Sequence, residues 1–290
     1  MFHRILVGFD GTPASHGALR LAQHLASPDA TLIVASVVLY DPGVGRAATV
    51  DIEPYLRDDG DATLDAARAL IGERPDTEYT APVATSVAAG LHRVARETLC
   101  DLIVIGASRR RGVGRVLLGS DAEATLHGAP CAVAVAPPAP GDSISRIGVA
   151  FDGTAAGRRA VAAAGALAAD RGAALTVLSV VDTRHVYATF GPDGGYGDLR
   201  SQARDLTTDA LAQVHGVPSI RRQLHEGDPV HEILSLARDV DLLVLGSRDN
   251  GPLLRLLLGS VSSSVVRRTR CATVIVPEKA PVPLVEAPSS

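Results

Sequence analysis

The residues best suited to chemistry in this sequence are aspartate, glycine and serine residues that occur twice in the same order. Asp10-Gly11 and Asp152-Gly153 each follow a short apolar run near the start of one half of the chain. An aspartate at the end of such a run can accept hydrogen bonds from a sugar or a base. The glycine after it tolerates the backbone angles of a tight turn. Each pair therefore predicts one end of a binding site.

Each half also contains a second set of glycine motifs. Gly106 and Gly246 end later apolar runs, and Gly119-Ser120 and Gly259-Ser260 follow them at the same spacing, with Val261-Ser262 extending the second motif. Glycine lets a backbone approach a ligand closely, and serine is a good N-cap for the helix expected next. Unpaired N–H groups at a helix start attract anions. Together the motifs predict a nucleotide site, with aspartate at the sugar and Gly-Ser at the phosphates.

The spacing of the two sets defines the domains. Equivalent motifs such as Gly106 and Gly246 are 140 residues apart, and a repeat of this length indicates two equivalent domains. The boundary is expected in the stretch 138–143, which is rich in proline and glycine as linkers are. The predicted parts are a first domain at 1–140, a second domain at 144–278 and a loose tail at 279–290.

Apolar runs alternate with helical patterns in both halves. Runs that are apolar throughout predict strands buried on both faces, which is typical of a parallel sheet covered by helices. Right-handed crossovers then give a doubly wound domain. We therefore predict an α/β fold of two tandem, Rossmann-like domains, each with a five-stranded parallel sheet. The predicted strands are 5–9, 31–39, 78–83, 102–105 and 132–136, and then 147–151, 175–181, 220–224, 242–245 and 273–276.

Such a sheet binds its ligands beyond the carboxyl ends of the strands, where the winding reverses direction. The loops at this point are those after the first and fourth strands of each half. They carry Asp10-Gly11 with Gly106, and Asp152-Gly153 with Gly246. The repeated motifs therefore fall where the fold is expected to bind a ligand.

The composition excludes several classes of function. The chain has 290 residues, 46% hydrophobic and 21% charged, with a net charge of −4. These values are typical of a globular protein and argue against binding nucleic acid through overall charge. No apolar run reaches membrane-spanning length, no signal peptide is recognisable, and three cysteines, an odd number, fit a reducing compartment. We therefore expect a cytoplasmic protein that binds neither membranes nor nucleic acid.

With these motifs the chain resembles the universal stress protein family in its tandem form, over nearly its whole length. The resemblance rests on V-G-F-D-G-T and V-A-F-D-G-T, on D-L-I-V-I-G and D-L-L-V-L-G, and on L-L-L-G-S-V-S-S-S-V-V in the second half. It implies a fold of the adenine nucleotide alpha hydrolase-like type, with ATP bound in the ATP-binding members. It also implies that Val37 and Val180 occupy the position whose backbone recognises adenine.

The chain departs from the ATP-binding pattern of Gly, two residues, Gly, nine residues and Gly-Ser or Gly-Thr. Arg109 and Asp249 replace the middle glycine. Arg109 could pair with phosphate through its guanidinium, and Arg248 is a candidate contact in the second half. Asp249 would repel phosphates unless Mg²⁺ intervenes or its side chain turns outward, and Asp121 would compete with a phosphate in the first half. The sequence leaves open whether one half or both bind ATP.

Each motif also has a simpler structural interpretation. The aspartates could only form turns before helices, since Asp-Gly is a common turn pair. Gly106 and Gly246 could end strands that need an unusual backbone angle. Ser120 and Ser260 are expected to be N-caps in either interpretation, and the two valines could be ordinary core residues.

Three functions remain open from the residues. The resemblance implies an ATP-binding regulatory or stress-response protein. A slow ATPase or phosphotransferase would need a base or a positioned water, and usually Mg²⁺, and no residue stands out as that base. The third is a scaffold of the same fold that binds no nucleotide. The histidines lack metal-ligand spacing, so we predict no catalytic or metal-binding residue and expect turnover to be absent or slow.

The last strand of each half, 132–136 and 273–276, is short, apolar and expected at a sheet edge, where strands readily pair with another chain. The resemblance implies that the halves form an internal pseudo-dimer through these strands, and that two chains associate as a homodimer. Val135→Asp or Val276→Lys should weaken this pairing, because a charge would be buried in an apolar contact. Small-angle scattering should then show looser domain packing or a smaller oligomer, and an unchanged profile would contradict the prediction.

Overall fold

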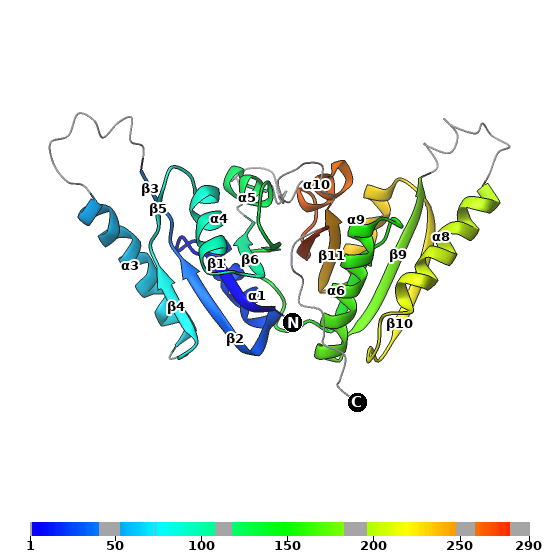
Figure 1. Ribbon diagram of the computed structural model, residues 1–290, viewed down its shortest axis with the longest axis horizontal. Helices are drawn as coiled ribbons and strands as arrows, with labels where there is room; N and C mark the ends of the chain where they lie inside the picture. Colours follow the sequence, from blue (N-terminus) through cyan, green and yellow to red (C-terminus); the bar gives the residue numbers. More distant parts are fainter. Residues whose placement is uncertain are drawn as a thin grey trace. The chain divides into compact units, whose positions relative to one another are not determined.

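The computed structural model describes residues 2–40, 53–72, 74–107, 118–182, 196–247 and 259–278. These residues form two compact units, the first within residues 2–140 and the second from residue 141 onward, and Figure 1 labels their helices and strands. Of the helices in these ranges, none has both the length and the apolar character needed to cross a membrane.

The first unit is an α/β domain with one five-stranded sheet and a short two-stranded one. Its elements are β1 (Phe2–Gly8), α1 (Pro13–Leu25), β2 (Ala26–Ala35), β3 (Val38–Leu39), α3 (Glu53–Ile71), β4 (Thr77–Thr80), β5 (Val83–Ala84), α4 (Val87–Glu97), β6 (Leu102–Gly106), α5 (Ser120–Leu126) and β7 (Ala132–Ala136). The strand order is β4-β2-β1-β6-β7, with all neighbours parallel. The winding therefore reverses direction between β1 and β6.

The second unit repeats this arrangement. Its elements are β8 (Arg146–Ala150), α6 (Ala155–Arg171), β9 (Ala174–Asp182), α8 (Tyr196–Leu211), β10 (Ile220–Gly227), α9 (Pro229–Asp239), β11 (Leu242–Ser247), α10 (Ser260–Val266) and β12 (Ala272–Pro277). The strand order β10-β9-β8-β11-β12 is again parallel throughout, and the winding reverses between β8 and β11. The predicted fold of two tandem, doubly wound, Rossmann-like domains is confirmed.

The apolar runs of the sequence are the central strands of these sheets. Ile5, Leu6 and Val7 of β1 are fully buried, as are Leu242 and Val244 of β11. In the second unit α6 packs against α8, and α9 packs against α10. Because each face of the sheet is covered by one such helix pair, the strands need apolar side chains on both faces.

The helices that follow the first strands begin at threonine caps. Thr12 and Thr154 are the N-caps of α1 and α6, and their hydroxyl oxygens accept hydrogen bonds from the amides of Ser15 and Gly157. Pro13 occupies the first helical position of α1. Its fixed backbone angle and missing N–H suit that position.

The outer part of the first sheet differs from the prediction. The expected strand 31–39 is divided into β2 and β3, and the expected strand 78–83 into β4 and β5. Pro82 lies between β4 and β5 and interrupts the expected strand, because proline has no N–H to donate to the ladder. Its carbonyl oxygen still accepts from the amide of Val38 at 3.0 Å, as Thr80 accepts from Ser36. The two segments therefore stay hydrogen-bonded to each other across the interruption.

An aspartate just before the fourth strand of each unit fixes the start of the first strand. In the first unit, the carboxylate of Asp101 accepts from the amides of His3 at 2.8 Å and Arg4 at 3.2 Å. In the second, Asp241 accepts from the amides of Ser145 and Arg146, from the Ser145 hydroxyl, and from the Arg146 guanidinium at 2.7 Å. The aspartate that opens the D-L-I-V-I-G and D-L-L-V-L-G motifs is therefore a structural residue.

The carboxylates of Asp101 and Asp241 are not equally stabilised in their charged form, because Arg146 donates to Asp241 whereas Arg4 donates elsewhere. Burial raises the pKa of the Asp101 carboxyl, against the lowering effect of its two backbone hydrogen bonds. Burial opposes ionisation of Asp241 as well, but the hydrogen bonds from Arg146 and Ser145 outweigh it and hold the pKa of Asp241 below its ordinary value. Arg4 instead donates from Nε to the carbonyl oxygen of Thr98 at 2.7 Å.

This difference predicts opposite pH effects for two matched substitutions. Asp241→Asn should lower the free energy of unfolding by about 2 kcal/mol at neutral pH, since it removes a charged acceptor with several donors. The deficit should shrink as the pH falls below about 4, where the wild-type carboxyl also becomes protonated.

Asp101→Asn is the matched control. Because the pKa of Asp101 is raised in the folded state, protonation stabilises the wild type as the pH falls toward about 4, and the deficit of this variant should grow in that range, above the range in which the Asp241 variant changes. Urea unfolding at a series of pH values measures both effects. Parallel pH profiles for the two variants would contradict the assignment.

Candidate functional site

The Asp-Gly pairs form the same tight turn in both units. Oδ1 of Asp152 accepts from the Thr154 amide at 3.1 Å and from the Thr154 hydroxyl at 2.5 Å. Oδ1 of Asp10 makes the same two bonds to Thr12, at 3.0 and 2.6 Å. The glycine between them has a positive φ, 75° at Gly11 and 77° at Gly153, a backbone angle that favours glycine. The aspartates therefore do form turns, and this turn fixes one carboxylate at the tip of the first strand.

Gly106 and Gly246 are required for a reason other than backbone angle. Neither has a positive φ among the residues that the structure describes, so the interpretation through an unusual backbone angle is wrong. A Cβ at Gly106 would lie 2.3 Å from the carbonyl oxygen of Ala14, and one at Gly246 would lie 2.7 Å from that of Ala156. The first turns of α1 and α6 therefore pack against these strand ends so closely that no side chain fits.

The expected N-caps Ser120 and Ser260 are wrong by one position. The caps are Gly119 and Gly259, with no side-chain capping bond, and the serines are the first residues of α5 and α10. The hydroxyl of Ser262 donates to the carbonyl oxygen of Gly246 at 3.2 Å. Since the first intrahelical amide bond of α10 runs from Ser263 to Gly259, the preceding amides have no acceptor within the helix.

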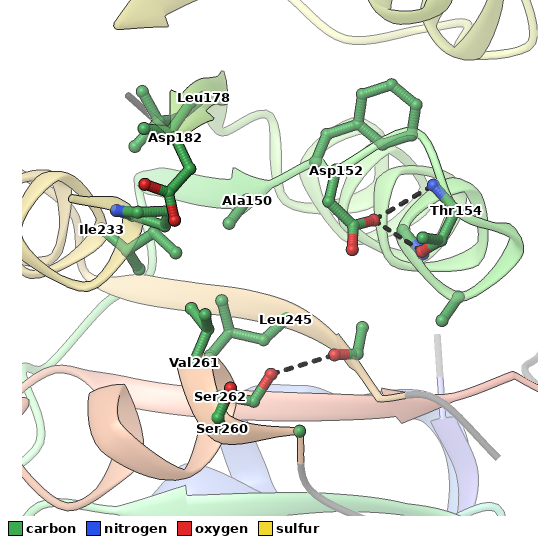
Figure 2. A pocket seen from close by; sticks show the side chains of 17 residues that line it. Ala150, Asp152, Thr154, Leu178, Asp182, Ile233, Leu245, Ser260, Val261 and Ser262 are labelled. Atoms are coloured by element: carbon green, nitrogen blue, oxygen red, sulfur yellow. Dashed lines mark hydrogen bonds between the residues drawn. The ribbon is translucent and has the colours of Figure 1, made fainter. Parts of the chain in front are cut away.

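A pocket of about 340 Å³ lies at the carboxyl ends of β8, β9 and β11 in the second unit. Its size is within the range of small-molecule sites. Figure 2 shows the side chains that line it. They come from the strand tips and from the starts of α6, α9 and α10. The lining residues are Ala150, Phe151, Asp152, Thr154, Ala156, Gly157, Leu178, Val180, Asp182, Pro229, Ile233, Leu245, Gly246, Gly259, Ser260, Val261 and Ser262.

The pocket has apolar walls and two carboxylates. In Figure 2, Asp182 lies beside Ile233 and Leu178, away from Asp152 and its turn with Thr154. Among the described residues that line the pocket there is no lysine, arginine or histidine. This part of the cavity is therefore suited to a ligand portion that donates hydrogen bonds and carries no negative charge.

The pocket brings together most of the residues that the sequence singles out in the second half. They are Asp152, Val180, Gly246, Gly259, Ser260, Val261 and Ser262. Gly153 shapes the turn and is not among the lining residues. Arg248 and Asp249 lie outside the described residues.

The first-half candidates occupy the corresponding elements of their unit. Asp10 and Gly11 follow β1, Gly106 ends β6, and Gly119 with Ser120 begins α5. Val37 lies between β2 and β3. Arg109 lies outside the described residues.

Sequence reasoning missed several lining residues of the second unit. Asp182 is one residue beyond the predicted strand 175–181, and Pro229 and Ile233 come from the start of α9. An acidic residue at the end of the second strand was the available signal for Asp182. The contribution of α9 depends on how that helix packs over the sheet, which no local pattern reveals.

The cysteines do not supply a nucleophile. Burial raises the pKa of the Cys100 and Cys131 thiols, and raises that of Cys271 to about 12. The sulfur of Cys271 donates to the carbonyl oxygens of Val240 and Ala272. A thiol that stays protonated at neutral pH is a poor nucleophile.

Comparison with known proteins identifies the family. The pattern of the universal stress protein family matches residues 1–137 and 143–277. The chain belongs to the universal stress protein family. Universal stress protein Rv2319c of Mycobacterium tuberculosis is 28% identical over 94% of this chain and 99% of its own length. A universal stress protein of Mycolicibacterium smegmatis is 29% identical over 94% of this chain and 96% of its own.

A solved structure supports the same fold. The crystal structure of a universal stress protein from Archaeoglobus fulgidus is 20% identical, covers 94% of this chain and 96% of that chain, and has a TM-score of 0.65. The predicted membership of this family in its tandem form is therefore confirmed.

The two glycines of the second-unit pocket predict contrasting stability effects. Gly246→Ala should lower the free energy of unfolding by about 2 kcal/mol or more, because the new Cβ meets the backbone of Ala156. Gly259→Ala should cost no more than about 1 kcal/mol, since φ is −65° and no described atom lies within 4 Å of the new Cβ. Thermal unfolding of both variants tests this difference, and equal losses would contradict it.

Proposed function

We propose that this protein is an ATP-binding regulatory module of the stress-response type, with its nucleotide site in the second-unit pocket. One observation carries the proposal. The carboxyl ends of three parallel strands and the start of α10 surround a cavity of about 340 Å³ at the point where the winding reverses. Open α/β sheets bind nucleotides at this point. Family membership and the repeated glycine motifs support the same assignment.

The pocket residues fit the parts of a nucleotide. The apolar side chains of Val180 and Ile233 would flank the base, with the backbone of Val180 in the position that the family resemblance assigns to adenine recognition. The carboxylate of Asp152, fixed by Thr154, would accept from the ribose. The hydroxyl of Ser260 and the first amides of α10 would receive phosphate.

The phosphates need positive charge that the described lining does not supply. Arg248 is the candidate in the second unit and Arg109 in the first. Mg²⁺ would serve the same purpose beside Asp249. Within the ranges that the structure describes, no group of three or more histidine, cysteine or acidic residues is arranged to hold a metal ion. Any Mg²⁺ would therefore be held mainly by the phosphates and by residues outside these ranges.

The proposal includes a reducing, cytoplasmic setting and a tandem chain that pairs as a homodimer. ATP occupancy would change the conformation or the choice of partner, and turnover would be absent or slow. Following ADP release over hours measures turnover, and a rate on the order of 1 s⁻¹, typical of enzymes, would contradict this part of the proposal.

Isothermal titration with ATP, with and without Mg²⁺, tests binding directly. Gly259→Ala should weaken ATP binding by about ten-fold or more, because its methyl group would occupy space where the backbone approaches the phosphates. Gly141→Ala is the matched control, since its Cβ would make only an ordinary contact of 3.7 Å with Ser143 and it does not line the pocket.

The outcomes separate the functions. Saturable binding by the wild type and the control, with weakened binding by Gly259→Ala, supports the site. No binding of millimolar ATP by the wild type, and no adenine nucleotide in a native mass spectrum of the purified protein, would leave the scaffold function instead.

A further inference from the structure

Asp182 is an acidic residue of the pocket that none of the repeated motifs contains. It ends β9 and lines the cavity together with Val180 and Ile233. Figure 2 shows its carboxylate on the pocket side of the strand, near Ile233. Its neighbour in the sheet register is Gly227 of β10, which has no side chain beside that of Asp182.

The charged groups nearby on β10 are engaged with other partners. Glu226 pairs with Arg200 at 2.9 Å, and His225 pairs with Glu232 at 2.6 Å. Neither Arg200 nor His225 is a lining residue of the cavity. The Asp182 carboxylate lines the β9 end of the pocket, on the side away from Ser260 and α10.

The first unit has a different residue at the equivalent position. Ala150 pairs with Leu178 in the second sheet, as Gly8 pairs with Ala35 in the first. Four residues after each partner come Asp182 in β9 and Leu39 in β3. Leu39 is 57% exposed, and its side chain cannot accept a hydrogen bond. The two units therefore differ in chemistry at the tip of their second strands.

We propose that Asp182 is a specificity-determining residue, which makes the second-unit site select nucleosides through a hydrogen-bond donor on the base or the ribose. This inference depends on the proposed nucleotide function. The donor is either the 6-amino group of adenine or a ribose hydroxyl, since both are neutral groups that a carboxylate can accept from. A phosphate is excluded at this end of the pocket because it would face Asp182 with like charge.

The orientation of the ligand follows from the same charges. Carboxylates lie at the β8 and β9 tips, and hydroxyls and amides lie at the start of α10. The nucleoside therefore occupies the β9 side of the cavity and the phosphates the α10 side. The first unit, with Leu39, retains apolar contact but lacks this selection.

The test compares ligands that each lack one donor. ATP, ITP, 2′-deoxyATP and 3′-deoxyATP are titrated by calorimetry against the wild type, Asp182→Asn and Asp182→Leu, the last of which copies the first unit. Asp209→Leu is the matched control, because Asp209 is an exposed aspartate of α8. Thermal unfolding without ligand reports whether each variant keeps its fold.

Asp182→Leu should weaken ATP binding by roughly ten-fold to a hundred-fold, as expected for one hydrogen bond to a charged acceptor. It should leave the binding of one analogue nearly unchanged, and that analogue identifies the donor: ITP for the amine, a deoxynucleotide for the hydroxyl. Asp182→Asn should lose less, since its carbonyl oxygen still accepts. The control should bind every ligand as the wild type does.

Two results would overturn the inference while leaving the nucleotide function intact. One is an equal loss of affinity for all four nucleotides, which would indicate a structural role for Asp182. The other is unchanged or tighter ATP binding by a folded Asp182→Leu variant. If the wild type binds none of the nucleotides, the proposed function itself is wrong and this inference with it.

Discussion

The geometry of the site depends on the close contact between the first turn of α6 and the end of β11. A Cβ at Gly246 would lie 2.7 Å from the backbone of Ala156 and 2.9 Å from the amide of Gly157. Because interiors are densely packed, the helix reaches this position only if the strand carries no side chain there. Gly246, Ala156 and Gly157 all line the pocket. The contact between helix and strand therefore also fixes the distance between the cavity walls.

The same contact explains why the acidic turn lies where it does. Thr154 caps α6 and at the same time donates twice to Asp152. The position of the helix therefore sets the position of the carboxylate. The first unit has the same three parts in Asp10, Thr12 and Gly106, with an even closer contact to Ala14.

The two units share a fold but differ in the chemistry of their strand tips and strand starts. At the starts of the strands, Asp241 is stabilised in its charged form by Arg146, whereas the donors to Asp101 among the described residues are backbone amides and burial raises its pKa. At the tips, Asp182 stands where the first unit has Leu39. Duplication supplies two equal backbones, and single side chains then make the second unit the more polar of the two at this position.

The sequence by itself determined the alternation of strands and helices and the duplication, because these depend on local periodicity and on motifs repeated along the chain. It also determined which strand tips carry Asp152 and Gly246. It did not determine that Gly259 rather than Ser260 is the cap, because either residue suits that position. Only the tertiary structure decided that Gly246 is needed for a helix contact, and that Asp182 and Ile233 join the same cavity. These facts depend on the packing of α6 and α9 against the sheet, which brings together residues far apart in the chain.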